Sequence, residues 1–328
     1  MKVLVTGATG FTGAHLARHL ARQGHAVAAL VRPSSLHKTE ALKRDEVEIR
    51  TGDLTDAAAV RRACEGIEVV FHIAATYREA GQADAAYTRV NVDGTRHVLE
   101  GALAARARRV VHCSTGGVHG HIEHPPANEN APLAPGDVYQ RTKLQAEQLA
   151  SRFGRERGLD VVVARPIGIY GPGDLRFLKM FRGIARGRFP LLGRGEVFYH
   201  LTYIDDLCRG FELCGTVPAA AGRTYILAGP EYTTLRKLIE LVAQELGVRP
   251  PWIRFPVWPV WLAGALCEAI CVPLKIDPPL YRRRVDFYRK SRAFDTRRAR
   301  EELGYNPGID LKTGIHLTAQ WYRSQGLL

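Results

Sequence analysis

Paired cysteines of the metal-binding or redox kind are missing from this sequence. Its 328 residues include only six cysteines, which are scattered along the chain, and no C-x-x-C motif occurs. The pattern predicts neither a zinc ribbon nor a disulfide framework, and a reducing cytoplasm suits it best. His112, His119, His121 and His124 are neighbours, but no cysteine or carboxylate stands beside them at a metal-ligand spacing. We therefore expect no metal site.

A run long enough to cross a membrane is also missing. The most hydrophobic stretch, residues 255–274, is interrupted by three prolines and one glutamate, whereas a spanning helix needs about 20 apolar residues. The stretch is either a buried helix or an exposed segment in peripheral contact with a membrane, helped by the arginines at 282–284. The chain opens on an apolar strand without a basic region and cleavage site, so we expect no secretory leader and a cytoplasmic location.

Acidic residues are in deficit. Asp and Glu number 33 against 46 Lys and Arg, so the net charge is +13. This balance favours an anionic partner, such as a phosphorylated cofactor or an acidic small-molecule substrate. Nucleic acid is not expected, because the sequence has neither a recognised binding module nor aromatic residues interleaved with the charge. The arginines that recur between residues 282 and 300 are expected on solvated helix faces.

Short apolar runs alternate with helical patterns along the chain. Runs typical of buried parallel strands are Val3–Val5, Ala26–Val31, Val47–Ile49, Val69–Ile73, Val110–Cys113, Val161–Ala164 and Tyr225–Leu227. Helices are predicted at Ala14–Gln23, Ala57–Cys64, Val92–Ala105 and Tyr139–Arg157. This alternation predicts an α/β fold with a Rossmann-type, doubly wound parallel sheet. We expect a dinucleotide-binding domain over 1–170, to which 203–228 returns, and a smaller, mainly helical substrate-binding lobe over 171–202 and 229–328.

The first strand leads into a glycine-rich loop, Thr6-Gly-Ala-Thr-Gly-Phe-Thr-Gly13. Its glycines allow a tight turn and let the backbone approach a pyrophosphate, while the following helix offers free N–H donors and the positive end of its dipole. The loop follows a strand and opens a helix, which is the context that a dinucleotide site requires. Cofactor contacts are predicted from Gly7, Thr9, Gly10, Phe11, Thr12 and Gly13.

The end of the second strand carries an arginine and no acid. An Asp or Glu here binds the adenosine ribose hydroxyls of NAD, whereas an arginine pairs with the 2′-phosphate of NADP. Arg32 follows Val31 in this chain, so the sequence favours NADP over NAD. Asp53 and Leu54 follow the third strand, where Asp53 is placed either to accept from the adenine amino group or to cap a helix.

Tyr139 and Lys143 are four residues apart on a predicted helix and so share one of its faces. An ammonium beside a phenol makes the phenol a better proton donor, as a tyrosine acting as general acid or base requires. Thr115, at the end of the preceding strand, is placed to hold a substrate oxygen beside the tyrosine. These three residues are the predicted catalytic group.

Together these motifs resemble those of the extended short-chain dehydrogenase/reductases, the superfamily of NAD-dependent epimerases/dehydratases and 3β-hydroxysteroid dehydrogenases. Besides the glycine loop and the Tyr139/Lys143 pair, the resemblance rests on Gly52–Leu54, His72–Ala75, Asn91–Thr95, Ser114-Thr115, Arg165–Asp174 and Tyr203–Leu207. It implies that Tyr139 is the general acid/base, that Lys143 binds the nicotinamide ribose, and that Thr115 orients the reacting oxygen. Further residues implied to line the cofactor are Ala74, Ala75, Pro166 and Ile167. A homodimer formed through the helices at Val92–Ala105 and Tyr139–Arg157 is common in the family.

Positions where this sequence departs from the family's motifs indicate which branch of the family it resembles. Gly116 follows Thr115 where the 4,6-dehydratases begin an Asp-Glu pair, and Gly168 stands where nucleotide-sugar enzymes place an asparagine. The run Ser291–Pro307, after an aromatic and apolar segment, looks like the 3β-hydroxysteroid dehydrogenase and dihydroflavonol reductase branch. The resemblance thus implies hydride transfer between NAD(P) and a hydroxyl/ketone carbon of a small apolar or polycyclic substrate.

Two alternatives stay open. Val118-His119-Gly120 resembles the V-Y-G of nucleotide-sugar epimerases, which hold NAD tightly, and the positive charge would suit a diphosphate. Other proteins of this fold bind the dinucleotide as sensors without catalysis, although they tend to lose the tyrosine or the lysine. Substrate contacts are expected from Thr76, Gly116, His119 and Gly168.

Overall fold

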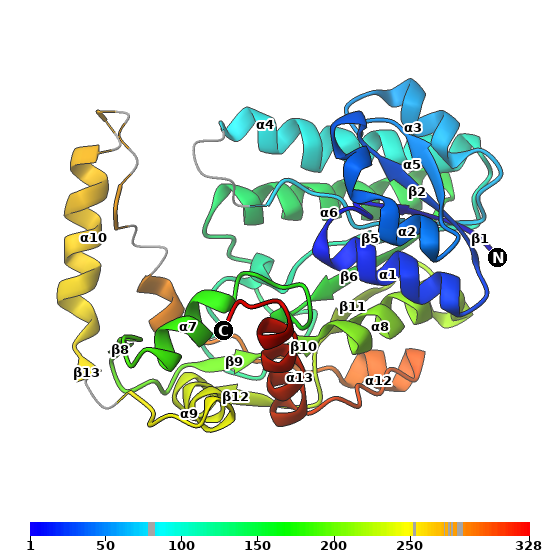
Figure 1. Ribbon diagram of the computed structural model, residues 1–328. Coiled ribbons are helices and arrows are strands. Elements are labelled where there is room, and N and C mark those ends of the chain that lie inside the picture. The colour runs from blue at the N-terminus through cyan, green and yellow to red at the C-terminus, as the bar shows by residue number, and fades with distance from the viewer. Residues whose placement is uncertain (78–82, 252–253, 272, 275, 277, 281–284) are drawn as a thin grey trace.

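Seven parallel strands form the central sheet of the computed structural model, and helices cover both of its faces (Figure 1). The structure describes residues 1–77, 83–251, 254–271, 273–274, 276, 278–280 and 285–328. The strand order is β11-β6-β5-β4-β1-β2-β3, so the order of strands reverses between β1 and β4. This is the doubly wound topology, and the predicted Rossmann-type sheet is confirmed.

All seven predicted strands are present, with ends shifted by at most two residues. They are β1 (Lys2–Thr6), β2 (Ala26–Val31), β3 (Glu48–Thr51), β4 (Val69–His72), β5 (Arg109–Cys113), β6 (Asp160–Pro166) and β11 (Thr224–Leu227). The pleat divides each strand between two cores: Val3 and Val5 of β1 join one apolar cluster, and Leu4 joins the other. Because both faces are covered, the inner strands have continuous rather than alternating apolar sequences, whereas the edge strand β3 contains only one apolar residue, Ile49.

The helices lie in two layers. On one face α1 (Phe11–Arg22) packs against α8 (Ile204–Thr216), and on the other α5 (Gly94–Ala104) lies between α3 (Ala57–Cys64) and α6 (Val138–Arg157). Shorter elements are α2 (Glu40–Arg44), α4 (Asp84–Thr88) and 3₁₀ turns at Pro33–Lys38, Gly116–His119 and Pro218–Ala220.

The helix predicted from Val92 starts differently, because a π-helical turn over Arg89–Asp93 precedes α5. Inside this turn the Asn91 side chain holds the backbone of Thr76, with Thr76 N donating to Oδ1 at 2.8 Å and Nδ2 donating to Thr76 O at 3.3 Å. The turn therefore fixes the segment that follows β4, which borders the ligand-binding edge of the sheet.

The smaller C-terminal lobe is mainly helical, as predicted (Figure 1). Its helices are α7 (Leu178–Ala185), α9 (Leu235–Leu246), α10 (Val257–Cys271), α12 (Arg297–Leu303) and α13 (Leu311–Ser324), with a 3₁₀ turn at Asp286–Tyr288. Short strands pair in twos: β7 (Ile169–Tyr170) with β10 (Thr202–Tyr203), β9 (Phe198–His200) with β12 (Tyr232–Thr234), and β8 (Leu191–Leu192) with β13 (Arg254–Phe255).

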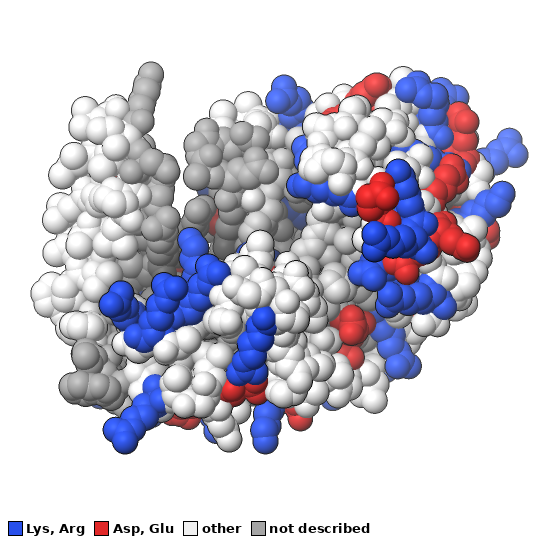
Figure 2. Space-filling model, in the orientation of Figure 1, with Lys and Arg blue, Asp and Glu red and all other residues white. Residues whose placement is uncertain are grey.

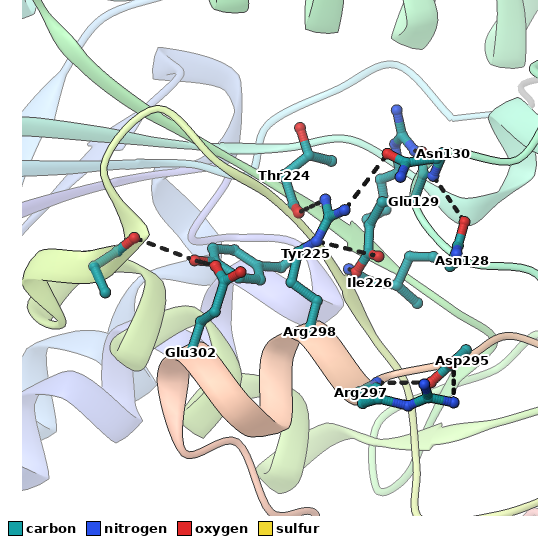
Figure 3. A network of polar contacts seen from close by, with 12 residues as sticks. Asn128, Glu129, Asn130, Thr224, Tyr225, Ile226, Asp295, Arg297, Arg298 and Glu302 are labelled. Carbon is teal, nitrogen blue, oxygen red and sulfur yellow. Dashed lines mark hydrogen bonds and ion pairs between the residues drawn. The ribbon is translucent and has the colours of Figure 1, made fainter.

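A polar network fastens α12 to the edge of the central sheet (Figure 3). The Arg298 guanidinium donates to Thr224 O of β11 at 3.3 Å and lies 3.7 Å from the Glu129 carboxylate. Glu302 accepts a hydrogen bond from the Tyr225 hydroxyl at 2.7 Å. The expectation of a solvated face is therefore wrong for Arg298, because this side of α12 packs against β11. The network also fixes the chain just before α12, which lines the cavity described below.

The helix α10 stands apart from the sheet at one side of the molecule (Figure 1). Only Gly264 is buried among the described residues of this helix, whereas Trp258 and Ile270 are 69% and 62% exposed. Of the two alternatives predicted for residues 255–274, the exposed segment therefore agrees with the structure and the buried helix does not. Among the described residues, no helix is long and apolar enough to cross a membrane. The arginines at 282–284 lie outside the described residues.

Candidate active site

A cavity of about 1090 Å³ lies over the carboxyl ends of the central strands, where the doubly wound fold places its ligands. Its wall brings together most of the residues predicted from the sequence. They are Gly7, Thr9, Gly10, Phe11, Thr12, Gly13, Arg32, Asp53, Leu54, Ala74, Ala75, Thr76, Thr115, Gly116, Tyr139, Pro166, Ile167 and Gly168. Lys143 and His119 are not part of this wall.

The glycine loop fits tightly between β4 and the first turn of α1. Gly7 has a φ of 73°, and a Cβ at this position would lie 2.8 Å from the Ala74 backbone. A Cβ on Gly13 would lie 2.2 Å from the Gly7 carbonyl oxygen. Gly10 precedes α1 and supplies no side-chain cap, so the first N–H groups of the helix have no side-chain acceptor. This arrangement fits a pyrophosphate bound at the start of α1.

Basic and hydroxyl side chains surround the end of β2. Arg32, Ser35 and Lys38 all line the cavity there. Asp53 lines the same cavity, and its Oδ1 accepts from Thr55 N at 2.8 Å and from Thr55 Oγ1 at 2.7 Å. Burial acts to raise the pKa of Asp53, but these hydrogen bonds and the Arg32 charge outweigh it and lower the pKa. Ser35 and Lys38 were not predicted from the sequence, although both follow Arg32 closely.

Tyr139 and Lys143 lie one turn apart on α6. Tyr139 lines the cavity, where its ring meets that of Tyr77 edge to face with the centroids 4.9 Å apart. Lys143 lies deeper and is only 2% exposed. Burial lowers the pKa of Lys143, and Cys113 and Glu147 partly offset this effect. The lysine is thus placed behind the tyrosine rather than at the surface of the cavity.

Thr115 and its neighbour Ser114 have different surroundings. Thr115 Oγ1 accepts a hydrogen bond from Gly117 N at 3.1 Å and lies at the start of the turn beside the cavity. The Ser114 hydroxyl donates to Glu147 Oε2 at 2.5 Å, in a buried position. The Ser114 hydroxyl therefore donates its proton to Glu147, whereas the Thr115 hydroxyl, which accepts from Gly117 N, can still donate its proton to a ligand.

The structure does not bring His119 to the cavity. The residue is 1% exposed, and its ring lies 5.5 Å from that of Phe294. Its Nδ1 pairs with Pro132 O at 3.1 Å, and its Nε2 pairs with Arg165 Nη1 at 3.0 Å. Burial lowers the pKa of His119, and the Arg165 charge lowers it further. The predicted substrate contact therefore has no geometric support, because protein groups already occupy both ring nitrogens.

The far side of the cavity is formed by the C-terminal lobe, which sequence reasoning did not resolve residue by residue. Its lining residues are mainly aromatic or basic: Arg176, Phe177, Lys179, Met180, Phe189, Tyr199, His200, Leu201, Phe287, Tyr288, Arg292 and Phe294. Four of these residues lie after position 250, where aromatic and arginine residues are abundant in the sequence, but only tertiary structure decides which of them face the cavity.

Comparison with known proteins agrees with this geometry. The sequence model of the NAD dependent epimerase/dehydratase family matches residues 3–228. The chain is 32% identical to a 2-alkyl-3-oxoalkanoate reductase of Stenotrophomonas maltophilia (strain K279a), over 96% of this chain and 97% of the relative. It is 29% identical to 3beta-hydroxysteroid-dehydrogenase/decarboxylase isoform 1 of Arabidopsis thaliana, over 96% and 78% of the two chains. The crystal structure of gox2253 superposes with a TM-score of 0.85 at 29% identity, covering 99% of each chain.

Proposed function

The chain belongs to the NAD dependent epimerase/dehydratase family, and on this basis we propose that it transfers a hydride between NAD(P) and a hydroxyl/ketone carbon of a small, apolar substrate. The family match confirms the resemblance to the extended short-chain dehydrogenase/reductases. One observation carries the proposal: the glycine loop, Tyr139, Thr115 and an aromatic wall all border one cavity. The two relatives named as a 3-oxoalkanoate reductase and a hydroxysteroid dehydrogenase support the same class of substrate.

Each polar residue has a distinct role in this proposal. The bound nicotinamide supplies or accepts the hydride. Tyr139, at the cavity wall, exchanges a proton with the substrate oxygen, and Thr115 donates a hydrogen bond to that oxygen. Lys143, which does not line the cavity wall, would hold a buried positive charge behind Tyr139 and, as the family resemblance implies, would bind the nicotinamide ribose of the cofactor. The N–H groups at the start of α1 would hold the pyrophosphate of the cofactor.

Replacement of the tyrosine tests this assignment. Tyr139→Phe removes the proton donor but keeps the ring that meets Tyr77. We expect NADPH oxidation with a panel of 3-oxoalkanoates and 3-ketosteroids to fall by about 10²–10⁴-fold, with cofactor affinity within about twofold of wild type. Tyr232→Phe is the matched control, since Tyr232 is 42% exposed and does not line the cavity. Full activity in Tyr139→Phe would refute the mechanism.

We propose NADP as the preferred cofactor. The end of β2 carries no acid to bind the adenosine ribose, whereas Arg32, Ser35 and Lys38 offer two positive charges and a hydroxyl at this end of the cavity. Such a group suits a 2′-phosphate. Asp53 lies nearby, but Thr55 already donates two hydrogen bonds to its Oδ1.

A nucleotide-sugar epimerase with tightly bound NAD is the main alternative within this family. Gly168 argues against it. Its φ is 46°, and a Cβ at this position would lie 2.4 Å from His200 O. The asparagine that nucleotide-sugar enzymes place here therefore does not fit. A non-catalytic dinucleotide sensor is the second alternative, and the retained Tyr139 and Lys143 argue against it.

We further propose peripheral membrane contact through residues 255–274. Trp258, Leu262, Leu266 and Ile270 recur every four residues along α10 and are all exposed, so they form one apolar stripe. The Arg289 guanidinium lies over the Trp261 ring at 5.2 Å. Figure 2 shows an uncharged surface over α10 and a group of basic side chains over the α7 region beside it. An apolar stripe with basic neighbours suits an anionic lipid surface.

Dimerisation through α5 and α6 remains a proposal as well. The two helices pack against each other on one face of the sheet, and they are the pair expected to form the contact. Light scattering after gel filtration would test it, with a mass near twice the 36.3 kDa of the chain as the expected result.

A further inference from the structure

Arg292 brings an unpaired positive charge to the substrate side of the cavity. The residue lines the cavity wall. Its Nε is buried and has no hydrogen-bond partner. Within the described part of the chain, no carboxylate lies within salt-bridge distance of its guanidinium. A buried N–H of a charged group without an acceptor is costly, which indicates that a ligand supplies the acceptor.

The backbone around Arg292 is held firmly in place. Arg292 N donates to Phe198 O at 2.8 Å, and Phe294 N donates to His200 Nδ1 at 3.4 Å. On the other side, Asp295 N donates to Ala127 O at 2.8 Å. The network of Figure 3 then anchors the following helix, α12, to the sheet. The guanidinium is therefore presented from a fixed segment rather than from a free loop.

The position of Arg292 relative to the catalytic group follows from its neighbour Phe294. Both residues line the cavity, and residues two apart in an extended segment are separated by roughly 7 Å on the same side. The Phe294 ring lies against the turn that follows Thr115, since a Cβ on Gly116 would be 3.5 Å from its Cζ. Arg292 thus lies two residues from an aromatic ring that borders the reacting end of the cavity.

The polar side chains near Arg292 do not neutralise its guanidinium. The Tyr199 hydroxyl donates to the Phe287 carbonyl, and Tyr288 donates to Pro190 O at 3.1 Å. His200 Nε2 pairs with Gly229 O at 2.9 Å, and burial lowers the pKa of His200 to about 4, so the ring is neutral. The described cavity lining contains one carboxylate, Asp53, which lies beside β2.

We propose that Arg292 binds a carboxylate on the substrate, which makes the substrate an amphiphilic carboxylic acid with its hydroxyl or ketone directed towards Tyr139. The aromatic wall would hold the apolar body, and a planar guanidinium matches a carboxylate through paired N–H donors. A diphosphate is less suited, because Arg176, the other arginine on this side, is already paired with Asp174 at 2.7 Å. This inference rests on the proposed function for the identity of the reacting group.

Binding of redox-inactive probes tests the inference without turnover. Decanoate and 2-naphthoate, with decanamide and 2-naphthamide as neutral counterparts, would be titrated calorimetrically into the NADP⁺-loaded full chain. We expect the carboxylates to bind the wild type at least tenfold more tightly than the amides. Arg292→Gln should lower the ratio of carboxylate affinity to amide affinity about ten- to a hundredfold. Arg292→Lys, which keeps the positive charge, should restore part of this ratio.

Two further variants test whether the carboxylate preference depends on Arg292 itself or on positive charge in general. Lys179→Gln removes a positive charge from the same cavity, and Arg297→Gln removes one from a side chain that is 74% exposed outside it. Both should keep the carboxylate preference. Equal binding of acids and amides by the wild type, an unchanged preference in Arg292→Gln, or a preference lost equally in Lys179→Gln would each overturn the proposal. A preference that depends on Arg292 in a protein without reductase activity would instead refute the proposed function and leave the carboxylate site standing.

Discussion

Glu147 and Arg165 form a buried ion pair behind the cavity, with Arg165 Nη2 2.5 Å from Oε1 and Arg165 Nε 3.1 Å from Oε2. Each side chain is less than a tenth exposed. The pair also orders the site: Glu147 accepts from Ser114, which precedes Thr115, and Arg165 donates to Glu129 O at 3.0 Å. One ion pair therefore connects α6, β6 and the segment after β5.

Removal of one partner of the Glu147–Arg165 ion pair should lower the free energy of unfolding. Glu147→Ala leaves Arg165 buried without its carboxylate, and breaking a buried pair in this way costs about 3–5 kcal/mol. We expect urea denaturation to show this loss in the free energy of unfolding. Glu156→Ala, at an exposed position on the same helix, should change it by no more than about 0.5 kcal/mol. Equal effects of the two variants would show that the pair contributes little to stability.

The glycine loop gives a second prediction. Gly13→Ala would place a Cβ 2.2 Å from the Gly7 carbonyl oxygen, so the loop must shift away from the pyrophosphate position. Alanine is more favourable than glycine in a helix by about 1 kcal/mol. Helix propensity alone would therefore stabilise α1 and would not explain a loss of cofactor affinity. We expect cofactor affinity to fall at least tenfold by calorimetry. Gly308→Ala, which has no atom within 4 Å of the new Cβ, should bind cofactor normally. Unchanged affinity in Gly13→Ala would place the dinucleotide elsewhere.

Cofactor choice depends on Arg32. The wild type should bind NADP⁺ more tightly than NAD⁺, and Arg32→Ala should reduce NADP⁺ affinity about ten- to a hundredfold while leaving NAD⁺ affinity nearly unchanged, since only NADP⁺ carries the 2′-phosphate. Arg44→Ala on α2 is the control, because Arg44 is exposed and does not line the cavity. Tight NAD⁺ binding that does not depend on Arg32 would reverse the cofactor assignment and favour the epimerase.

The stripe on α10 predicts binding to lipid. Vesicles of phosphatidylglycerol and phosphatidylcholine should sediment the protein, and Leu266→Ser with Ile270→Ser should weaken this binding at least tenfold, since each buried aliphatic side chain contributes about 1.5–3 kcal/mol. Leu133→Ser changes a 38% exposed leucine outside this helix and should have no effect. Should the stripe instead join two copies of the chain, the double variant would alter the mass in solution and leave sedimentation unchanged.

Much of the fold could be predicted from the sequence, because buried parallel strands are continuous apolar runs. The seven strands differ from their predicted ranges only at their ends, and the glycine loop and the Tyr139/Lys143 pair are local motifs whose spacing can be read directly. Apolar periodicity alone did not place the start of α5, because the π turn at Asn91 is accompanied by a contact with Thr76, which is distant in sequence. Pattern alone did not decide the exposure of α10, since buried and membrane-facing helices share an apolar composition.

The sequence also did not predict which residues line the substrate side of the cavity. His119 and Arg292 both lie in polar, histidine- or arginine-rich segments, yet one is buried against Arg165 and the other lines the cavity. Arg298 and Arg297 are adjacent, but only Arg298 is drawn into the contact with β11 (Figure 3). These differences arise from how the C-terminal segment packs across the sheet, which no local spacing encodes.

Transfer of deuterium from labelled cofactor tests the central claim most directly. The protein would be incubated with NADPH that carries deuterium at both C4 positions of the nicotinamide and with the panel of 3-oxoalkanoates and 3-ketosteroids, and the products analysed by mass spectrometry. The account predicts one deuterium on the carbinol carbon for each NADPH oxidised, lost in Tyr139→Phe and retained in Tyr232→Phe. Absence of deuterium from every product, in a protein that purifies with NAD already bound, would contradict the oxidoreductase and point to an epimerase.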